Sequence, residues 1–308
     1  MTSLIFKSIK KLSPHKYPDK IFIKAIQEEI AIYSIHTNLD NVFLGVNNIL
    51  AEKLELENCR ILSPQKGLLK KLVTFCPDIH LSDGIYVPDM VRTSLFNAGA
   101  GCIGNYDNCS FNMQGEGTFR GLEGTDQFIG TKGELTSQKE IRVEVIFPVY
   151  NQKSVINALL SAHPYEEVAY DIYPLDNFFE DVGAGIIGEL TVPSKETDFL
   201  DFVKDQLGLI SVKHSHFLNK KVIRVAICGG SGSFLINDAI KEKADIFLTG
   251  DLKYHDFFEA DNKILLADIG HYESEQFTID LLYEYLIKNF NNFAFQKTKL
   301  KTNPINYF

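Results

Sequence analysis

Cysteine is scarce in this sequence and forms no recognisable pattern. The 308 residues include five cysteines and no Cys-x-x-Cys pair; the five are Cys59, Cys76, Cys102, Cys109 and Cys228. An odd number without paired spacing indicates neither a disulfide framework nor a thiolate zinc site. We therefore expect buried free thiols in a reducing compartment.

Long hydrophobic runs are also absent. No apolar stretch approaches the roughly 18 residues that a membrane span requires. The first residues, MTSLIFKSIKKL, have an apolar core of only Leu4–Phe6, which is too short for a signal peptide. These absences predict a cytoplasmic protein without a membrane partner.

Positive charge is in deficit. Lysine and arginine number 31 against 40 aspartates and glutamates, which gives a formal charge of −9. Because phosphate neutralisation supplies most of the affinity for nucleic acid, this balance argues against a nucleic-acid partner. Hydrophobic residues at 45% and charged residues at 23% are typical of a globular chain. The length suggests about two domains.

Both ends of the chain show an α/β pattern. Apolar residues at helical spacing predict a helix over 20–29, and the continuous apolar run at 30–35 predicts a strand buried on both faces. A polar loop and a second helix at 46–56 follow. Near the C-terminus, an amphipathic helix is predicted at 197–207 and a closing helix at 277–290. Between them, buried strands are predicted at 222–228, 246–249 and 264–267.

The middle of the chain repeats a shorter unit. Strand and helix patterns recur at 72–77, 87–98, 143–148, 154–163 and 168–173, and residues 99–140 read as turns and short strands. Two βαβ halves in tandem suggest a ferredoxin-like module. The predicted fold class is therefore a discontinuous α/β domain (1–70 and 178–308) with an inserted ferredoxin-like α+β domain (71–177).

Polar residues follow each buried strand of the α/β domain. These are His36, Asn38 and Asp40; the loop Gly229–Ser233; Asp251 and His255; and Asp268, His271 and Glu275. Because the ends of parallel strands meet at one edge of a sheet, we expect these groups to converge there.

His271 and Glu275 form the sharpest pair. Four residues apart at the start of a helix, they share one face and could hold a metal, with the glutamate bridging two ions. Alternatively, Glu275 complements the helix dipole and Asp40 is a turn residue or cap. Their convergence leaves the metal site and these structural roles about equally supported.

Other candidates are less specific. His255 could carry protons near neutral pH or could be an ordinary helix histidine. The loop Gly229–Ser233 could cradle an anion, although a tight strand-to-helix turn accounts for it slightly better. His214 and His216 share a strand face, where two half-exposed edge residues are more common than a metal pair.

Four ordered motifs resemble one known family. HTNLDN (36–41), CGGSGS (228–233), TGDLKYHD (249–256) and DIGHYESE (268–275) resemble the GTP cyclohydrolase 1 type 2 homologues, also called NGG-interacting-factor-three-like or dinuclear metal centre proteins. The resemblance extends over essentially the whole chain. NAGAGCIGNYDNCSF, GEGTFRGLEG and SAHPYEEVAYDIYPL resemble the insert of longer bacterial members, which is similar to the CutA and PII-signalling-protein fold.

The resemblance implies a metal site and an incomplete N-terminus. It implies two divalent ions per subunit (zinc, manganese or iron), held by Asp40, His271 and a bridging Glu275, together with a His-His-Pro motif before Leu4-Ile5-Phe6. Met1-Thr2-Ser3 stands there instead, so both histidines and the family's N-terminal portion are missing. A fragment, a misassigned start or a shortened homologue would each explain this.

Two functions are compatible with these observations. One is a metal-dependent hydrolase of a nucleotide-like or phosphate-bearing substrate, in which His36 or His255 handles protons. The alternative is a non-catalytic binding or regulatory assembly with a vestigial metal site and a small-molecule ligand in the insert. In both cases the resemblance implies a homo-oligomer, specifically a hexamer.

Overall fold

The computed structural model describes residues 11–307, and the Leu4–Phe6 motif lies outside them. The chain divides into two compact units, unit 1 (1–64 and 181–308) and unit 2 (65–180). The sequence places the corresponding insertion at 71–177. Within the described part of the chain, none of the helices has the length and apolar character needed to cross a bilayer.

Unit 1 is built on a six-stranded sheet with the order β1-β6-β8-β9-β10-β7. Strands β8, β9 and β10 are parallel, whereas β6 pairs antiparallel with β8 and β7 antiparallel with β10. The strands are β1 (Leu56–Lys66), β6 (Phe178–Lys195), β7 (Lys213–His214), β8 (Lys221–Ser231), β9 (Ile246–Gly250) and β10 (Leu265–Asp268). The parallel centre confirms the α/β class expected from the continuous apolar strands.

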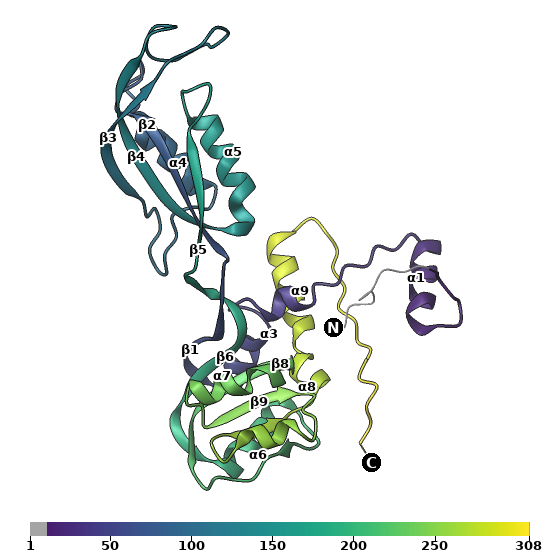
Figure 1. Ribbon diagram of the computed structural model, residues 1–308. Coiled ribbons are helices and arrows are strands. Elements are labelled where there is room, and N and C mark those ends of the chain that lie inside the picture. The colour runs from purple at the N-terminus through teal and green to yellow at the C-terminus, as the bar shows by residue number, and fades with distance from the viewer. Residues whose placement is uncertain (1–10, 308) are drawn as a thin grey trace. The chain divides into compact units, whose positions relative to one another are not determined.

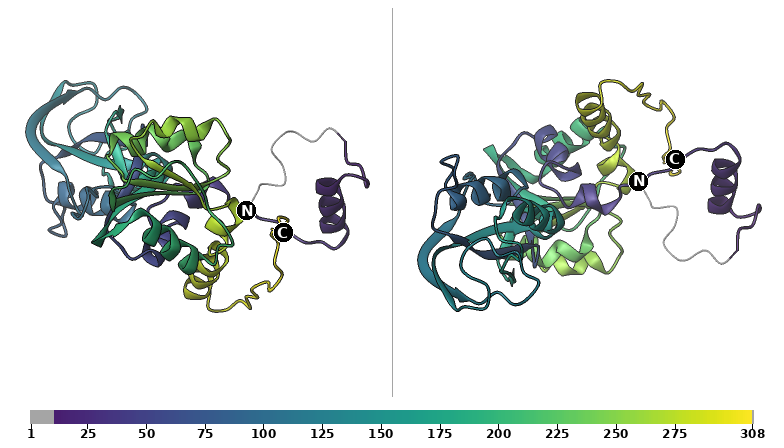
Figure 2. Two further views of the ribbon diagram at one scale, coloured as in Figure 1. Left: turned by 90° about the horizontal axis from the view of Figure 1, so that it is seen from below. Right: turned by 90° about the horizontal axis from the view of Figure 1, so that it is seen from above.

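Helices cover both faces of this sheet (Figure 2). One face packs on α3 (Val46–Lys53) and α6 (Glu196–Leu207), and the other on η2 (Ser233–Leu235), α7 (Ile236–Lys241) and η3 (Asp256–Ala260). The remaining helices of unit 1 are α1 (Tyr17–Gln27), α2 (Thr37–Asp40), α8 (His271–Glu275) and α9 (Thr278–Asn289). Because helices cover both faces of the sheet, a site is expected at the ends of its strands.

Unit 2 has the connectivity βαββαβ and the sheet order β3-β4-β2-β5 (Figure 1). All of its strand pairs are antiparallel, which is the ferredoxin-like arrangement predicted from the sequence. Its elements are β2 (Leu69–Pro77), α4 (Val87–Asn97), β3 (Phe111–Phe119), β4 (Thr136–Pro148), η1 (Val149–Asn151), α5 (Gln152–Ala162) and β5 (Tyr170–Leu175). Helices α4 and α5 pack against one face of the sheet.

One predicted strand is wrong. The run at 30–35 has no regular secondary structure, and Ile30, Ile32 and Tyr33 are 57%, 48% and 81% exposed. A continuous apolar run becomes a strand only where neighbouring strands can pair with it. Among the described residues, the sheet order of unit 1 contains no partner for this run.

Three strands were not located from the sequence. β3 lies inside the segment predicted to form turns and short strands, where its polar, glycine-containing and mostly exposed sequence FNMQGEGTF gives no clear bounds. β1 and β6 begin in one unit and end in the other, and their burial changes along their length. None of the three shows the uniform apolar signal of the buried central strands.

Candidate metal centre

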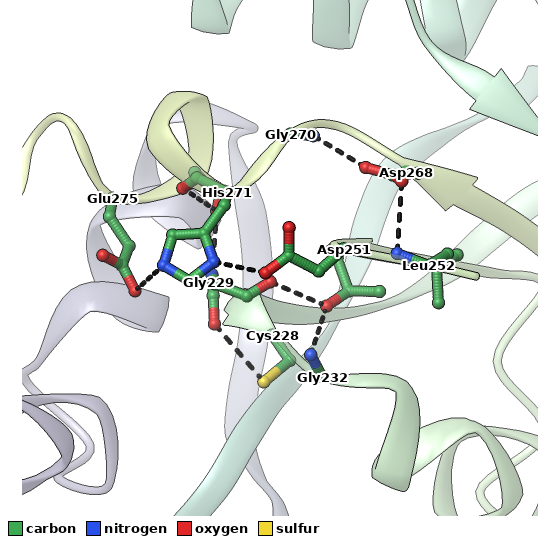
Figure 3. Close-up of polar contacts among 12 residues, drawn as sticks. Cys228, Gly229, Gly232, Asp251, Leu252, Asp268, Gly270, His271 and Glu275 are labelled. Carbon is green, nitrogen blue, oxygen red and sulfur yellow. Dashed lines mark hydrogen bonds and ion pairs between the residues drawn. The ribbon is translucent and has the colours of Figure 1, made fainter. Parts of the chain in front are cut away.

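His271 lies between two carboxylates at the first residue of α8 (Figure 3). Its Nδ1 is 2.6 Å from Oδ2 of Asp251, and its Nε2 is 3.4 Å from Oε1 of Glu275. Glu275 is the i+4 residue of the same helix, so the predicted pair does share a face. Asp251 comes from the end of β9 and has a left-handed backbone with φ 57°.

The two carboxylates fix the charge and orientation of the imidazole. The hydrogen bond with Glu275 raises the pKa of His271 to about 9, against the opposing effect of burial, and Asp251 adds to the rise. Burial opposes ionisation of Glu275, but its interactions, including the one with His271, lower its pKa overall. Binding through Nδ1 to an outer carboxylate is how metal-ligating histidines are usually oriented, with the other nitrogen directed at the ion.

Asp40 shares a small cavity with Glu275. His36, Asp40 and Glu275 line one cavity of about 20 Å³, with apolar walls from Leu39, Val46 and Leu282. Burial raises the pKa of Asp40, and the nearby negative charge of Glu275 raises it further. The cavity is large enough for about one water molecule or ion.

Close backbone approaches hold α8 against the strand ends. A Cβ on Gly230 would lie 2.5 Å from Oε1 of Glu275, and one on Gly250 would lie 2.8 Å from the amide nitrogen of His271. At Gly250 the contact is with backbone, and at Gly230 the positive φ of 68° adds strain for any side chain. The glycines at the ends of β8 and β9 therefore make room for α8.

Two buried side chains connect the motifs. Asn47 donates from Nδ2 to the carbonyl of Asp40 (3.0 Å) and accepts from the amide of Gly229 (2.8 Å). Ser274 accepts from the amide of Gly230 (2.8 Å) and donates to the carbonyl of His271 (2.9 Å). Sequence reasoning missed both residues, since one asparagine and one serine on helices carry no distinctive pattern.

The amides of the Gly229–Ser233 loop are bonded to neighbouring elements rather than open to an anion. The amides of Gly229, Gly230 and Gly232 donate to Asn47, Ser274 and Thr249 respectively. With these donors already engaged, the tight turn describes the loop better than the anion cradle does.

Cys228 lies beside the same carboxylates. Burial raises the pKa of its thiol to about 12, and the charges of Asp40 and Glu275 add to the rise. The thiol therefore stays protonated at neutral pH. The expectation of buried free thiols holds for Cys228 and Cys76, whereas Cys59 and Cys109 are half-buried and Cys102 is exposed.

The other sequence candidates lie outside this cluster. His255 is exposed at the start of η3, next to the rings of Tyr254 and Phe258. His214 and His216 are exposed, and His214 lies on the edge strand β7. Asp268 is buried, accepts from the amides of Leu252 and Gly270, and pairs with Lys213. Asp268 therefore stabilises the strand-end loops.

The donor set fits a divalent ion in its chemistry but is not assembled around one position. An imidazole and two carboxylates are ligands that suit zinc, manganese and iron. Among the described residues, however, no three histidine, cysteine or acidic side chains are arranged to hold one ion together. His271 and Glu275 are side by side, whereas Asp40 lines the cavity that Glu275 also lines.

The chain is similar to known proteins over nearly its whole length. The family model Duf34/NIF3 (NGG1p interacting factor 3) matches residues 3–304. A Bacillus subtilis protein named GTP cyclohydrolase 1 type 2 homolog is 40% identical over 87% of this chain and 70% of its own length. A protein of the same name from Halalkalibacterium halodurans is 38% identical over 82% of this chain and 66% of its own length.

A solved structure is similar over nearly the whole chain. The crystal structure of a Bacillus cereus protein related to NIF3 superposes with a TM-score of 0.83 at 38% identity, covering 99% of this chain and 81% of that one. This chain spans about two thirds of the length of the two curated relatives.

Proposed function

Because this chain belongs to the Duf34/NIF3 family, we propose that it binds a divalent metal ion through His271, Glu275 and Asp40 and uses the ion in hydrolysis of a nucleotide-like, phosphate-bearing substrate. One observation carries the proposal. Asp251 occupies Nδ1 of His271, so that Nε2 faces Glu275 at 3.4 Å beside the cavity that Asp40 lines.

The metal would be zinc, manganese or iron. Bound there, such an ion would supply Lewis-acid polarisation of a phosphoryl oxygen. Glu275 is the residue best placed to contact two ions, because it lies between His271 and the cavity shared with Asp40. A positive ion would also lower the raised pKa of Asp40 and keep that carboxylate ionised.

His36 is the better-placed of the two proposed proton carriers. It lines the same cavity as Asp40 and Glu275. His255 is exposed, and its described ring contacts are with Tyr254 and Phe258. We therefore assign proton transfer to His36, whose imidazole can hold or release a proton next to the substrate.

Metal binding by matched histidine variants tests the site. Isothermal titration calorimetry of the full chain with zinc or manganese should show a site that His271→Ala weakens at least about tenfold. His255→Ala, which removes an exposed histidine, should leave the affinity unchanged. Equal binding by wild type and His271→Ala, or a larger loss with His255→Ala, would contradict the assignment.

A second function is favoured by cavity sizes. The cavity at the metal centre measures about 20 Å³, whereas one in unit 2 measures about 320 Å³. A binding or regulatory protein whose ligand sits in unit 2 would be expected to show this difference. Manganese-dependent release of product from GTP, lost in Glu275→Gln and retained in Glu284→Gln on the exposed side of α9, would favour the hydrolase.

Homo-oligomerisation stays a prediction. The resemblance implies a hexamer, and sedimentation velocity of the full chain gives its mass directly. A monomer at micromolar concentration would contradict it.

A further inference from the structure

Unit 2 contains a cavity that the metal centre does not use. It has a volume of about 320 Å³ and is lined by the end of β3, the segment 120–129, Glu140 and the segment 165–169. This volume is at the small end of the roughly 300–1,000 Å³ typical of small-molecule pockets. The helices α4 and α5 pack on the face of the sheet that carries Ile141 and Val143, so the alternating residue Glu140 belongs to the opposite face.

The walls of this cavity are tied together by specific bonds. His163 is buried, contacts the carbonyl of Phe75 through Nε2 (3.0 Å) and accepts from the amide of Tyr165 through Nδ1 (3.1 Å). Glu166 accepts from the amide of Asp126 (2.7 Å), which joins the 120–129 segment to the 165–169 segment. The cavity therefore has a defined lining.

Gln127 is the unusual group in that lining. Within the described part of the chain, neither its Nε2 nor its Oε1 has a hydrogen-bond partner, although both atoms are buried. Leaving such a group unpaired costs about 1–3 kcal/mol of stability. A Cβ on Gly121 would lie 1.8 Å from Oε1 of Gln127, so the glycine makes room for the amide.

The surroundings of Gln127 are aromatic. The rings of Phe119 and Phe128 lie 6.1 and 6.3 Å from that of Tyr165, and all three residues line the cavity. Flat aromatic walls suit a planar ring, because base–aromatic stacking contributes about 1–3 kcal/mol per base. A carboxamide offers one donor and one acceptor side by side, which matches the N6/N7 edge of adenine.

The charges of the lining select against phosphate. Glu140, Glu166 and Glu167 contribute three carboxylates, whereas Arg120 contributes one guanidinium. A phosphorylated ligand would meet net negative charge there, and a neutral nucleoside would not.

We propose that this cavity binds adenosine or a similar neutral adenine derivative, which draws the buried Gln127 carboxamide into the cavity to pair with the adenine edge while Phe119, Phe128 and Tyr165 pack against the ring. The ligand supplies the hydrogen bonds that the carboxamide lacks in the free protein. The proposal is independent of the metal centre, because every residue it uses lies in unit 2.

Calorimetric titration of the full chain with adenosine tests the proposal. Binding at one site per chain is expected, and Gln127→Leu should weaken it at least about fivefold. Gln206→Leu, which changes an exposed glutamine on α6, should bind as wild type does. Guanosine presents two acceptors where adenine presents a donor and an acceptor, so it should bind more weakly, as should AMP because of its charge.

Thermal melts without ligand separate binding from a structural role. If Gln127 serves a ligand, Gln127→Leu removes two unpaired buried atoms and the apo protein melts at the same or a higher temperature. Gly121→Ala, which displaces the carboxamide but keeps it, should also weaken adenosine. Absence of adenosine binding, equal affinity for all nucleosides, or a lower apo melting temperature together with unchanged affinity in Gln127→Leu would overturn the proposal.

Discussion

The two sheets of this protein leave different parts open for a site. The six-stranded sheet of unit 1 is covered by helices on both faces, so its polar residues gather at the ends of parallel strands. The four-stranded sheet of unit 2 has helices packed on one face, and a cavity of about 320 Å³ involves Glu140 on the other. In each unit, what the helices leave uncovered decides where a ligand can bind.

The polar side chains at the two candidate sites also differ in their hydrogen bonding. At the candidate metal centre, Asn47 and Ser274 each bridge two backbone groups and hold the motifs in position. In the cavity of unit 2, the described structure gives the Gln127 carboxamide no partner. The first arrangement preorganises a site, whereas the second leaves a bond for the ligand to make.

The largest expected effect concerns the independence of the units. The core of unit 2 is formed by residues from Leu72 to Ile172, all within its own limits. We expect a chain comprising Gln65–Glu180 to fold alone and to melt cooperatively when followed by near-ultraviolet circular dichroism. A broad transition without tertiary signal would show that unit 2 depends on unit 1.

The next largest effect is a difference in stability between two asparagine variants of unit 1, one at a buried bridging residue and one at a surface contact. Asn47 is 4% exposed, so Asn47→Ala leaves buried groups of Asp40 and Gly229 unpaired and should cost about 1–3 kcal/mol in the free energy of unfolding. The neighbouring Asn48 only bonds the exposed Glu52, so Asn48→Ala should stay within about 0.5 kcal/mol. Urea denaturation measures the change in unfolding free energy for each variant. Equal changes would show that Asn47 does not preorganise the site.

The smallest effect is an opposite response of the units to pH. Burial lowers the pKa of His163 below 6.5, despite its hydrogen bond to Phe75. Its unfolded form therefore binds a proton more readily than its folded form, and unit 2 should lose stability as pH falls from 7 to 5. His163→Asn should remove this part of the dependence in urea titrations.

His271 acts with the other sign. The hydrogen bond with Glu275 raises its pKa from 6.5 to about 9, so its folded form binds the proton more tightly. The stabilisation is complete below about pH 6.5 and is lost as pH rises through about 9. In metal-free protein, unit 1 should therefore weaken between pH 7 and 9.5, and His271→Asn should weaken less over that interval. The same pH slope in both proteins would contradict the assignment.

Sequence patterns predicted the parts of the molecule that depend on uniform burial. The parallel strands β8, β9 and β10 and the strands β2, β4 and β5 of unit 2 were recognisable because they are apolar or regularly alternating. Residues 30–35 show the same apolar pattern but form no strand, because pairing depends on a neighbour that the pattern itself does not describe.

Some residues of the candidate sites could likewise be predicted from the sequence, and others could not. His271 and Glu275 could be paired from their spacing, and Asp251 was expected at the same sheet edge. The bond of Asp251 to His271 depends on the left-handed turn after β9, which sequence spacing does not reveal. Gln127 could not be found from the sequence, since its lack of a partner is a property of the folded loop.

Anomalous X-ray diffraction from crystals of the full chain grown with zinc tests the metal centre most directly. The account predicts an ion bonded to Nε2 of His271 and to the carboxylate of Glu275 at about 2.0–2.2 Å, with Asp40 drawn in as a further ligand. Nδ1 of His271 should remain on Asp251. Zinc found only at exposed histidines such as His214 and His216, with His271 still paired to Glu275, would contradict it.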